Sequence, residues 1–299
     1  MCGIVGLFLK DKSLEPQLGE MLSDMLVVMS DRGPDSAGIA IYSQDGSQTK
    51  ITLQSADPET DFSGLEAEIS TEIGQEVTAV RRDTHLVLDV PRNKSDQVRE
   101  YLATRGETLR IMSSGEAVEI YKEVGLPADV VDRFGIRSMT GSHGVGHTRM
   151  ATESAVTTLG AHPFSTDEDQ CLVHNGSLSN HNSLRRKLKR AGMRIETEND
   201  TEVGAAFIAH QMQQGASLGE ALETSLSELD GFYTFVVGTK GGFGVLRDPI
   251  ACKPAVLAET DQYVAFGSEY RALVNLPGIE DAKVWEPEPA TVYFWEHAA

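Results

Sequence analysis

The second residue of the chain, Cys2, can act as a nucleophile. Removal of the initiator methionine is normal when a small residue follows, and it would give Cys2 a free α-amino group beside its thiol. With reference pKa values of about 7.7–8.0 for the amine and about 8.5 for the thiol, one residue would hold both a base and a nucleophile. Such a pair can attack a carbonyl carbon. The alternative is that the small residue serves only methionine removal and that Cys2 belongs to a buried strand.

A thiol that attacks an amide needs two hydrogen-bond donors for the negative oxygen that develops. The segment HNGS (174–177) offers two candidates, the side-chain amide of Asn175 and the backbone N–H of Gly176. The alternative is a plain tight turn, because Asn-Gly is a favoured turn dipeptide. We expect the strand that carries this segment to turn here.

Three further residues can bind the rest of an amino acid. Arg149, in GHTRMAT (146–152), can hold a carboxylate with two hydrogen bonds, and Thr152 can add a hydroxyl. Asp200, at the start of an expected helix, can bind an ammonium group or can merely cap the helix. Taken with the thiol and the two donors, these residues predict a pocket for an α-amino acid with a side-chain amide, which is glutamine or asparagine.

The expected elements alternate between strands and helices around these residues. Apolar residues at helical spacing predict a helix over about 15–30, which ends at the loop DRGPDSAG (31–38). Runs at 4–9 and 38–42 predict buried strands. Further helices are expected over about 94–104, 118–125, 128–135, 181–191, 198–212 and 218–229, and short strands after 232. This order predicts a layered α+β fold, with two sheets and helices packed outside them.

The composition excludes several classes of function. The 299 residues carry 26 Lys and Arg against 45 Asp and Glu, a net charge of −19, which disfavours binding to nucleic acid or to an anionic membrane surface. No apolar run approaches the ~20 residues of a membrane span, and the first charge, Lys10, follows the N-terminal apolar stretch, unlike a signal peptide. Three cysteines without a CxxC pair fit a reducing cytosol, so we expect a cytoplasmic protein.

Several segments, in order, resemble the class II (N-terminal-nucleophile) glutamine amidotransferases, and most closely their amidophosphoribosyltransferase branch. The class motifs are MCGIVG (1–6), DRGPDSAG (31–38), GHTRMAT (146–152), AHPF (161–164), HNGSLSN (174–180) and NDTE (199–202). The likeness to the branch lies in GLPADVVDRFG…GSHGVGHTR (125–149) and RDPIACKPAVLA…FGSE (247–269). The resemblance implies a four-layer αββα fold, in which two antiparallel sheets lie between helices. It spans one domain over 2–299, with an inserted subdomain at about 46–112 whose internal layout the sequence does not reveal.

The resemblance also implies a role for each candidate residue. Cys2 is the nucleophile, Asn175 and Gly176 form the oxyanion hole, and Arg149 and Asp200 bind the α-carboxylate and α-amino groups of glutamine. Thr152 lines the pocket, and Arg32 supports the nucleophile, although it can equally hold a turn by an ion pair. Because the α-amine supplies the base, His147 and His162 are expected to be structural. Cys171 and Cys252 are expected to be inert, and no cofactor or metal is implied.

These motifs do not identify the group that accepts the ammonia. The sequence ends soon after the last expected strand, so we expect the ammonia acceptor to lie on a separate subunit. The chain resembles the glutaminase subunit of N-methylglutamate synthase and related glutamate-synthase-like systems. Two alternatives are an autonomous amide hydrolase and a non-catalytic regulatory subunit of the same fold. The inserted subdomain is either a docking or gating element or a tolerated surface insertion.

Overall fold

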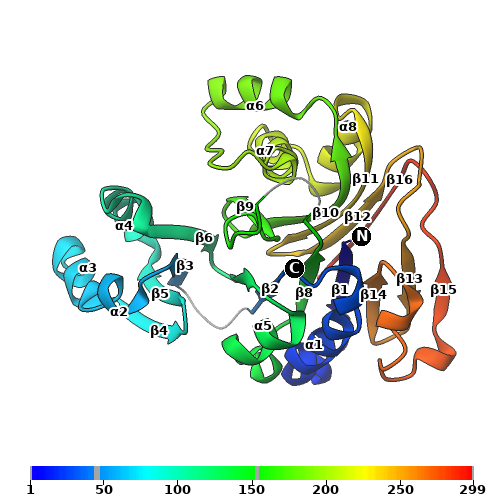
Figure 1. Cartoon of the computed structure of the whole chain (residues 1–299), viewed down its shortest axis with the longest axis horizontal. Helices are drawn as coiled ribbons and strands as arrows, with labels where there is room; N and C mark the ends of the chain where they lie inside the picture. The colour runs from blue at the N-terminus through cyan, green and yellow to red at the C-terminus, as the bar shows by residue number, and fades with distance from the viewer. Residues whose placement is uncertain (1, 44–47, 152–154, 298–299) are drawn as a thin grey trace.

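Two antiparallel sheets stacked face to face form the body of the protein, with helices on both outer sides (Figure 1). The computed structural model describes residues 2–43, 48–151 and 155–297. The four-layer α+β fold predicted from the sequence is confirmed by this arrangement. A third sheet lies to one side of the sandwich.

The larger sheet of the sandwich has seven strands, and the strand that follows Cys2 lies at its centre. This strand, β1, pairs with β14 on one side and β8 on the other. Across the sheet the order is β15 (Lys283–Trp285), β13 (Val256–Glu259), β14 (Tyr263–Gly267), β1 (Gly3–Leu9), β8 (His143–Arg149), β2 (Ser36–Tyr42) and β7 (Val118–Val124).

The smaller sheet of the sandwich has five strands and carries the HNGS segment. Its order is β16 (Thr291–Glu296), β12 (Gly242–Arg247), β11 (Gly231–Thr239), β10 (Gln170–Leu178) and β9 (Phe164–Asp167). The strands described in both sheets pair antiparallel throughout.

The alternation of side chains along each strand produces three apolar layers. Ile4 and Phe8 of β1 point between the sheets, where they join Val173 of β10 in one buried cluster. Val5 and Leu7 of β1 point the other way, to the outer helices. The strand β1 is therefore apolar on both faces, which explains the uninterrupted apolar run at its place in the sequence.

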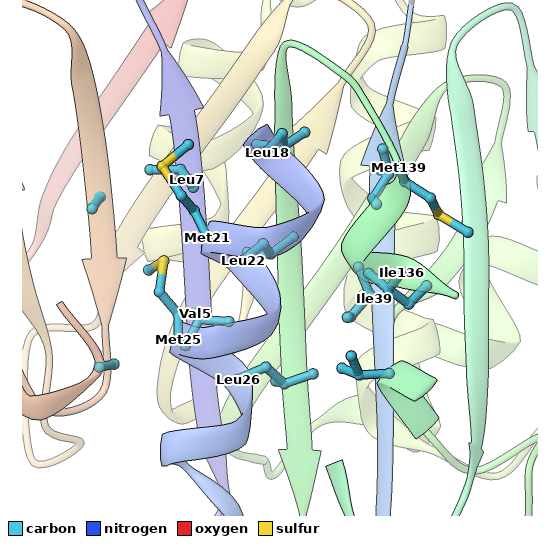
Figure 2. Packing of buried hydrophobic residues seen from close by; sticks show 14 of the residues in the cluster. Val5, Leu7, Leu18, Met21, Leu22, Met25, Leu26, Ile39, Ile136 and Met139 are labelled. Atoms are coloured by element: carbon cyan, nitrogen blue, oxygen red, sulfur yellow. The ribbon is translucent and has the colours of Figure 1, made fainter. Parts of the chain in front are cut away.

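The helix α1 (Leu18–Val28) covers the outer face of the larger sheet, together with α5 (Pro127–Phe134). Figure 2 shows Leu18, Leu22 and Leu26 of this helix packed over the strands. The helix begins later than the predicted residue 15, because residues Lys12–Gln17, which include Pro16, form a 3₁₀ helix. Pro16 has no N–H to donate within a helix.

Three helices cover the outer face of the smaller sheet (Figure 1). Each matches an expected helix, and α8 begins with a capping box between Ser217 and Glu220. They are α6 (His181–Arg190), α7 (Asp200–Gln213) and α8 (Leu218–Glu228). None of the described helices is long and apolar enough to cross a membrane.

Residues 48–115 form the third sheet, which has its own hydrophobic cluster. Ile51, Leu65 and Leu88 are among the fully buried members of this cluster. The strand order is β4 (Thr78–Arg82), β5 (His85–Pro91), β3 (Gln48–Ser55) and β6 (Leu109–Gly115), with helices α2 (Pro58–Asp61), α3 (Leu65–Ile73) and α4 (Ser95–Ala103). The helix expected over 94–104 corresponds to α4.

Short 3₁₀ segments complete the described elements. They are η1 (Lys12–Gln17), η2 (Ser30–Arg32), η3 (Arg92–Lys94), η4 (Gly106–Thr108), η5 (Ile136–Ser138), η6 (Tyr270–Ala272) and η7 (Ile279–Asp281).

The helix predicted over 118–125 is wrong, because this segment is the edge strand β7. Its residues alternate between two clusters: Val118 and Ile120 face the inter-sheet core, while Tyr121 faces the outer one. The charged residues between them concealed this period. Lys122 is buried all the same, since the carbonyl oxygens of Ala161 and Pro163 accept from its ammonium group at 2.8 and 3.1 Å.

Candidate active site

Cys2 lies at the N-terminal end of the central strand β1, and its side chain is half-buried. Its Sγ lies 3.8 Å from the carbonyl oxygen of Met150. The neighbouring Gly3 pairs with Thr148 of β8, so the strand register sets Cys2 beside the end of β8. The thiol is thus carried by a strand with partners on both sides, while the sulfur itself reaches the surface.

The backbone carbonyl of Cys2 is held by two of the predicted site residues. Arg32 Nε donates to this oxygen at 2.9 Å, and Asn175 Nδ2 donates to it at 3.1 Å. These three residues come from three separate segments of the chain. The structure therefore brings Cys2, Arg32 and Asn175 into one contact, as expected of a common site.

The predicted turn at Asn175-Gly176 is wrong, because β10 continues straight through both residues to Leu178. Asn175 pairs with Thr234 and Gly176 with Tyr233 of β11. Gly176 has a φ of +145°, and a Cβ there would lie 2.0 Å from the carbonyl oxygen of Phe232. Only glycine fits here, so the dipeptide serves a close approach of two strands rather than a chain reversal.

The side-chain amide of Asn175 already uses both of its hydrogens. One goes to the carbonyl of Cys2, and the other goes to Ser268 Oγ at 3.2 Å. For this amide to stabilise a substrate oxyanion, one of those two bonds must be exchanged. The residue is almost fully buried, which limits the positions that the amide can take.

Arg149 and Asp200 are positioned by two different elements, β8 and α7. Arg149 ends β8 opposite Ser36, is largely buried, and has its Nη1 3.4 Å from the carbonyl oxygen of Ala155. Asp200 opens α7, but Asn199 caps this helix by accepting from Thr201 N at 2.9 Å. The carboxylate of Asp200 instead accepts from Leu178 N at 2.9 Å, at the end of β10. Thr152 lies outside the described residues.

A buried group of histidines lies behind these residues. His147 Nε2 donates to the carbonyl of His174 at 3.2 Å, and its ring stacks on His162 at 4.0 Å. Thr201 Oγ1 bonds both His162 and His174, at 2.7 and 2.9 Å. Burial lowers the pKa of His147 to about 3 and that of His162 well below its usual value. Both rings are therefore neutral at pH 7 and act by hydrogen bonding and packing.

Three residues beside the predicted site residues were not expected from the sequence to have a role. Asp35 accepts from Ala151 N at 2.7 Å, which ties the loop 31–38 to the end of β8. Ser268 bonds Asn175, and Glu269 forms an ion pair with Arg32. Their positions in the sequence could have identified them, because Asp35 lies in DRGPDSAG and the other two lie in FGSE. Both segments carry the family resemblance.

The two unused cysteines differ in their surroundings. Cys171 is buried and lies 3.3 Å from the hydroxyl of Tyr42, and burial raises its pKa to about 11. Cys252 is exposed. Among residues 2–43, 48–151 and 155–297, no group of three or more His, Cys, Asp or Glu side chains has the arrangement of a metal site.

The αββα sandwich is the N-terminal-nucleophile hydrolase fold, and Cys2 directly precedes its central strand. The solved glutamine phosphoribosylpyrophosphate amidotransferase from B. subtilis has the same fold, with a TM-score of 0.62 and 19% identity. The match covers 99% of this chain and 47% of that one, so the chain spans about half the length of that structure.

The family follows from the sequence comparisons. A model of the glutamine amidotransferase domain matches residues 147–275. The glutamine amidotransferase-like protein GlxB of Rhizobium meliloti is 66% identical over 298 residues, 99% of either chain. A putative glutamine amidotransferase of Methanothermobacter thermautotrophicus is 32% identical over 98% of this chain and 99% of its own. The chain therefore belongs to the glutamine amidotransferase family.

Proposed function

We propose that this chain is a glutaminase subunit that hydrolyses glutamine through a Cys2 thioester and passes the ammonia to a separate synthase subunit. One observation carries the proposal. Arg32 and Asn175 both donate hydrogen bonds to the backbone carbonyl of Cys2, while the Cys2 side chain is only half-buried. A fixed backbone and an accessible thiol are what a nucleophile at a chain end requires.

The chemistry begins once Met1 is removed and Cys2 has a free amine. The amine takes the thiol proton, and the sulfur adds to the amide carbon of glutamine. The developing oxyanion accepts from Gly176 N–H and from the Asn175 amide, which gives up one of its present partners. The C–N bond then breaks, the amine returns the proton to the leaving nitrogen, and ammonia departs. Water attacks the resulting thioester by the same route, releasing glutamate and restoring the thiol.

The ends of the glutamine substrate have matched partners at the site. The guanidinium of Arg149 binds the α-carboxylate, and the carboxylate of Asp200 binds the α-ammonium group, with Thr152 alongside. Arg32 does not touch substrate in this scheme, because its Nε is directed to the carbonyl of Cys2. In this proposal residues 2–299 are one type 2 amidotransferase domain, with residues of about 46–112 inserted in it.

The partner is proposed to be glutamate-synthase-like, as in N-methylglutamate synthase. Support comes from the overall resemblance of this chain to the glutaminase subunit of that group. The proposed product of the complex is formed from ammonia or an amine delivered at the partner's own site, where any redox cofactor would be bound.

The first experiment combines intact mass with labelling by a glutamine-analogue electrophile. We expect the loss of Met1, one label on Cys2, and slow release of ammonia from glutamine that a copurified partner increases. Retention of Met1 in active protein contradicts the α-amine mechanism. Undiminished ammonia release by Cys2→Ala contradicts the whole proposal, and full turnover that no partner changes favours an autonomous hydrolase.

A further inference from the structure

Ser268 and Glu269, the two residues after β14, lie alongside the start of β1. Strand β14 pairs with β1 so that Gly267 faces Val5. Ser268 N then donates to the carbonyl of Ile4 at 2.9 Å, and Ile4 N donates to Ser268 Oγ at 2.9 Å. Ser268 thus bonds Ile4 through both its backbone and its side chain, two residues from the nucleophile.

The Ser268 hydroxyl also fixes Asn175. It accepts from Asn175 Nδ2 at 3.2 Å, while the other hydrogen of the same nitrogen goes to the carbonyl of Cys2. Ser268 is only 2% exposed, so water does not replace it easily. The plane of the Asn175 amide, and with it the hydrogen bond to Cys2, is therefore set by this serine.

Glu269 fixes the second donor to Cys2. Its carboxylate accepts from Arg32 Nη1, and Arg32 Nε points at the Cys2 carbonyl. This hydrogen bond, followed by the charges of Arg32 and Arg271, holds the pKa of Glu269 below its usual value, so the group is ionised at pH 7. Arg32 is largely buried, and without Glu269 its charge would be poorly compensated.

The Cys2 carbonyl matters because its direction fixes the ψ angle of Cys2. The ψ angle in turn sets where the α-amine lies with respect to the rest of β1, and the sulfur is attached to the same Cα. A displacement of about 1 Å in a reacting group can cost on the order of a hundredfold in rate. Both donors to this carbonyl are held by consecutive residues of one segment.

We propose that Ser268 and Glu269 are positioning residues of the amide-hydrolysing site, which orient Cys2 through Asn175 and Arg32 without touching the substrate. This inference rests on the proposed function of Cys2. It predicts that the two residues govern the turnover rate rather than the affinity for glutamine, because they act on Cys2, Asn175 and Arg32 and not on Arg149 or Asp200, which bind the ends of glutamine in the proposal.

The outer side of Glu269 is held more weakly. Arg271 Nε lies 2.6 Å from the second carboxylate oxygen, and Arg271 Nη1 lies 3.3 Å from Asp31. Its side chain is 40% exposed, so water and salt screen this pair. Replacing Arg271 by alanine should therefore change kcat by no more than about threefold. Loss of the ion pair between Arg32 and Glu269 should lower kcat further.

The test measures ammonia release from glutamine by the full chain. For Glu269→Ala we expect kcat to fall roughly 10- to 100-fold, with KM for glutamine within about threefold. The matched control is Glu259→Ala, because Glu259 is also ion-paired, to Lys10, and its side chain is 31% exposed against 33% for Glu269. The control should keep the kcat of the unmodified chain.

A double variant tests whether Glu269 acts through Arg32. If it does, Arg32→Ala/Glu269→Ala is no slower than Arg32→Ala alone. For Ser268→Ala, the label of the glutamine analogue should reach Cys2 about tenfold more slowly, while iodoacetamide reacts at a rate within threefold of the unmodified chain. Ser225→Ala, which removes another buried hydroxyl far from Cys2 in α8, should change neither rate.

The outcomes separate this inference from the function on which it rests. If the unmodified chain neither releases ammonia nor takes the label at Cys2, the proposed function fails, and this inference with it. If the unmodified chain is active and Glu269→Ala equals Glu259→Ala, only the positioning role is refuted. A loss in the double variant that equals the product of the single losses also refutes it.

Discussion

The candidate active site and the four-stranded sheet of residues 48–115, which we propose to be an insertion and call the inserted sheet, differ in how far apart in the chain their parts lie. The site joins Cys2 to Arg32, Asn175 and Ser268, which are separated by up to 266 positions in the chain. The inserted sheet closes on itself within residues 48–115 and has a separate apolar cluster. A site assembled from distant segments depends on the whole sandwich, whereas a local sheet can open by itself.

The largest expected effect is on the site side of this comparison. Cys2→Ala should abolish glutamine hydrolysis, with a loss of at least about 10³-fold in kcat, because no other group takes over the thioester. Released ammonia measures this effect. Stability should stay within about 0.5 kcal/mol, because the side chain is half-buried and small. Cys252→Ser, an exposed cysteine, is the control and should be fully active.

A smaller loss of kcat is expected when the proposed oxyanion donor is removed. Asn175→Ala removes the amide that faces Cys2, and kcat should fall by roughly 10²- to 10³-fold. The measurement is steady-state kinetics with glutamine. If kcat is unchanged and only KM rises, Asn175 is a binding residue and the oxyanion assignment is wrong.

Core variants of the inserted sheet should lower its stability and leave kcat nearly unchanged. Leu88→Ala, at a fully buried position of its cluster, should destabilise this sheet by about 2–5 kcal/mol while kcat stays within twofold. Hydrogen exchange at β5 amides reports the first effect and ammonia release the second. Leu172→Ala is the matched variant in the sandwich, at an equally buried leucine, and it should destabilise the region that carries the site. Equal effects of both variants on activity would mean that the two regions unfold together.

Acid should act on both regions through buried histidines. Burial lowers the pKa of His85 in the inserted sheet and of His143 in the sandwich to about 3. In the unfolded chain these imidazoles bind a proton near pH 6.5, whereas in the folded chain they stay neutral. The free energy of unfolding is therefore highest above pH 6.5 and decreases as the pH falls towards 3. Each group contributes up to about 1.4 kcal/mol per pH unit.

The variant His85→Phe removes the titration of the histidine that lies between the inserted sheet and α5. Its ring can keep the edge contact that His85 makes with Phe134. Urea unfolding at pH 7.5 and 5.5 should show a smaller loss for His85→Phe than for the unmodified chain, by about 1 kcal/mol. Identical losses in both proteins would show that His85 is not kept neutral by the fold.

The sequence predicted the fold through its period and its motifs, and it failed where local preference and tertiary contacts disagreed. The strand β7 resembled a helix because Glu119, Lys122 and Glu123 interrupt its apolar alternation, and only partners across the structure explain why Lys122 and Glu123 are buried. The Asn-Gly dipeptide favours a turn in isolation, but pairing with β11 keeps it extended.

The same limit applies to the site. The motifs placed Cys2, Arg32 and Asn175 on the list of site residues, and the structure brings them into contact, while their catalytic roles stay predictions. Ser268 and Glu269 were visible only as part of a motif. Their contacts depend on the pairing of β14 with β1, between residues 264 positions apart, which no local pattern encodes.

The central place of β1 has a consequence for heat inactivation. This strand is buried along its whole length and bonded on both sides, so its amides should be among the last to exchange with solvent. A nucleophile attached to such a strand keeps its geometry until the sandwich itself melts. Loss of activity on heating should then coincide with the main calorimetric transition, and an earlier melting of the inserted sheet would leave turnover intact.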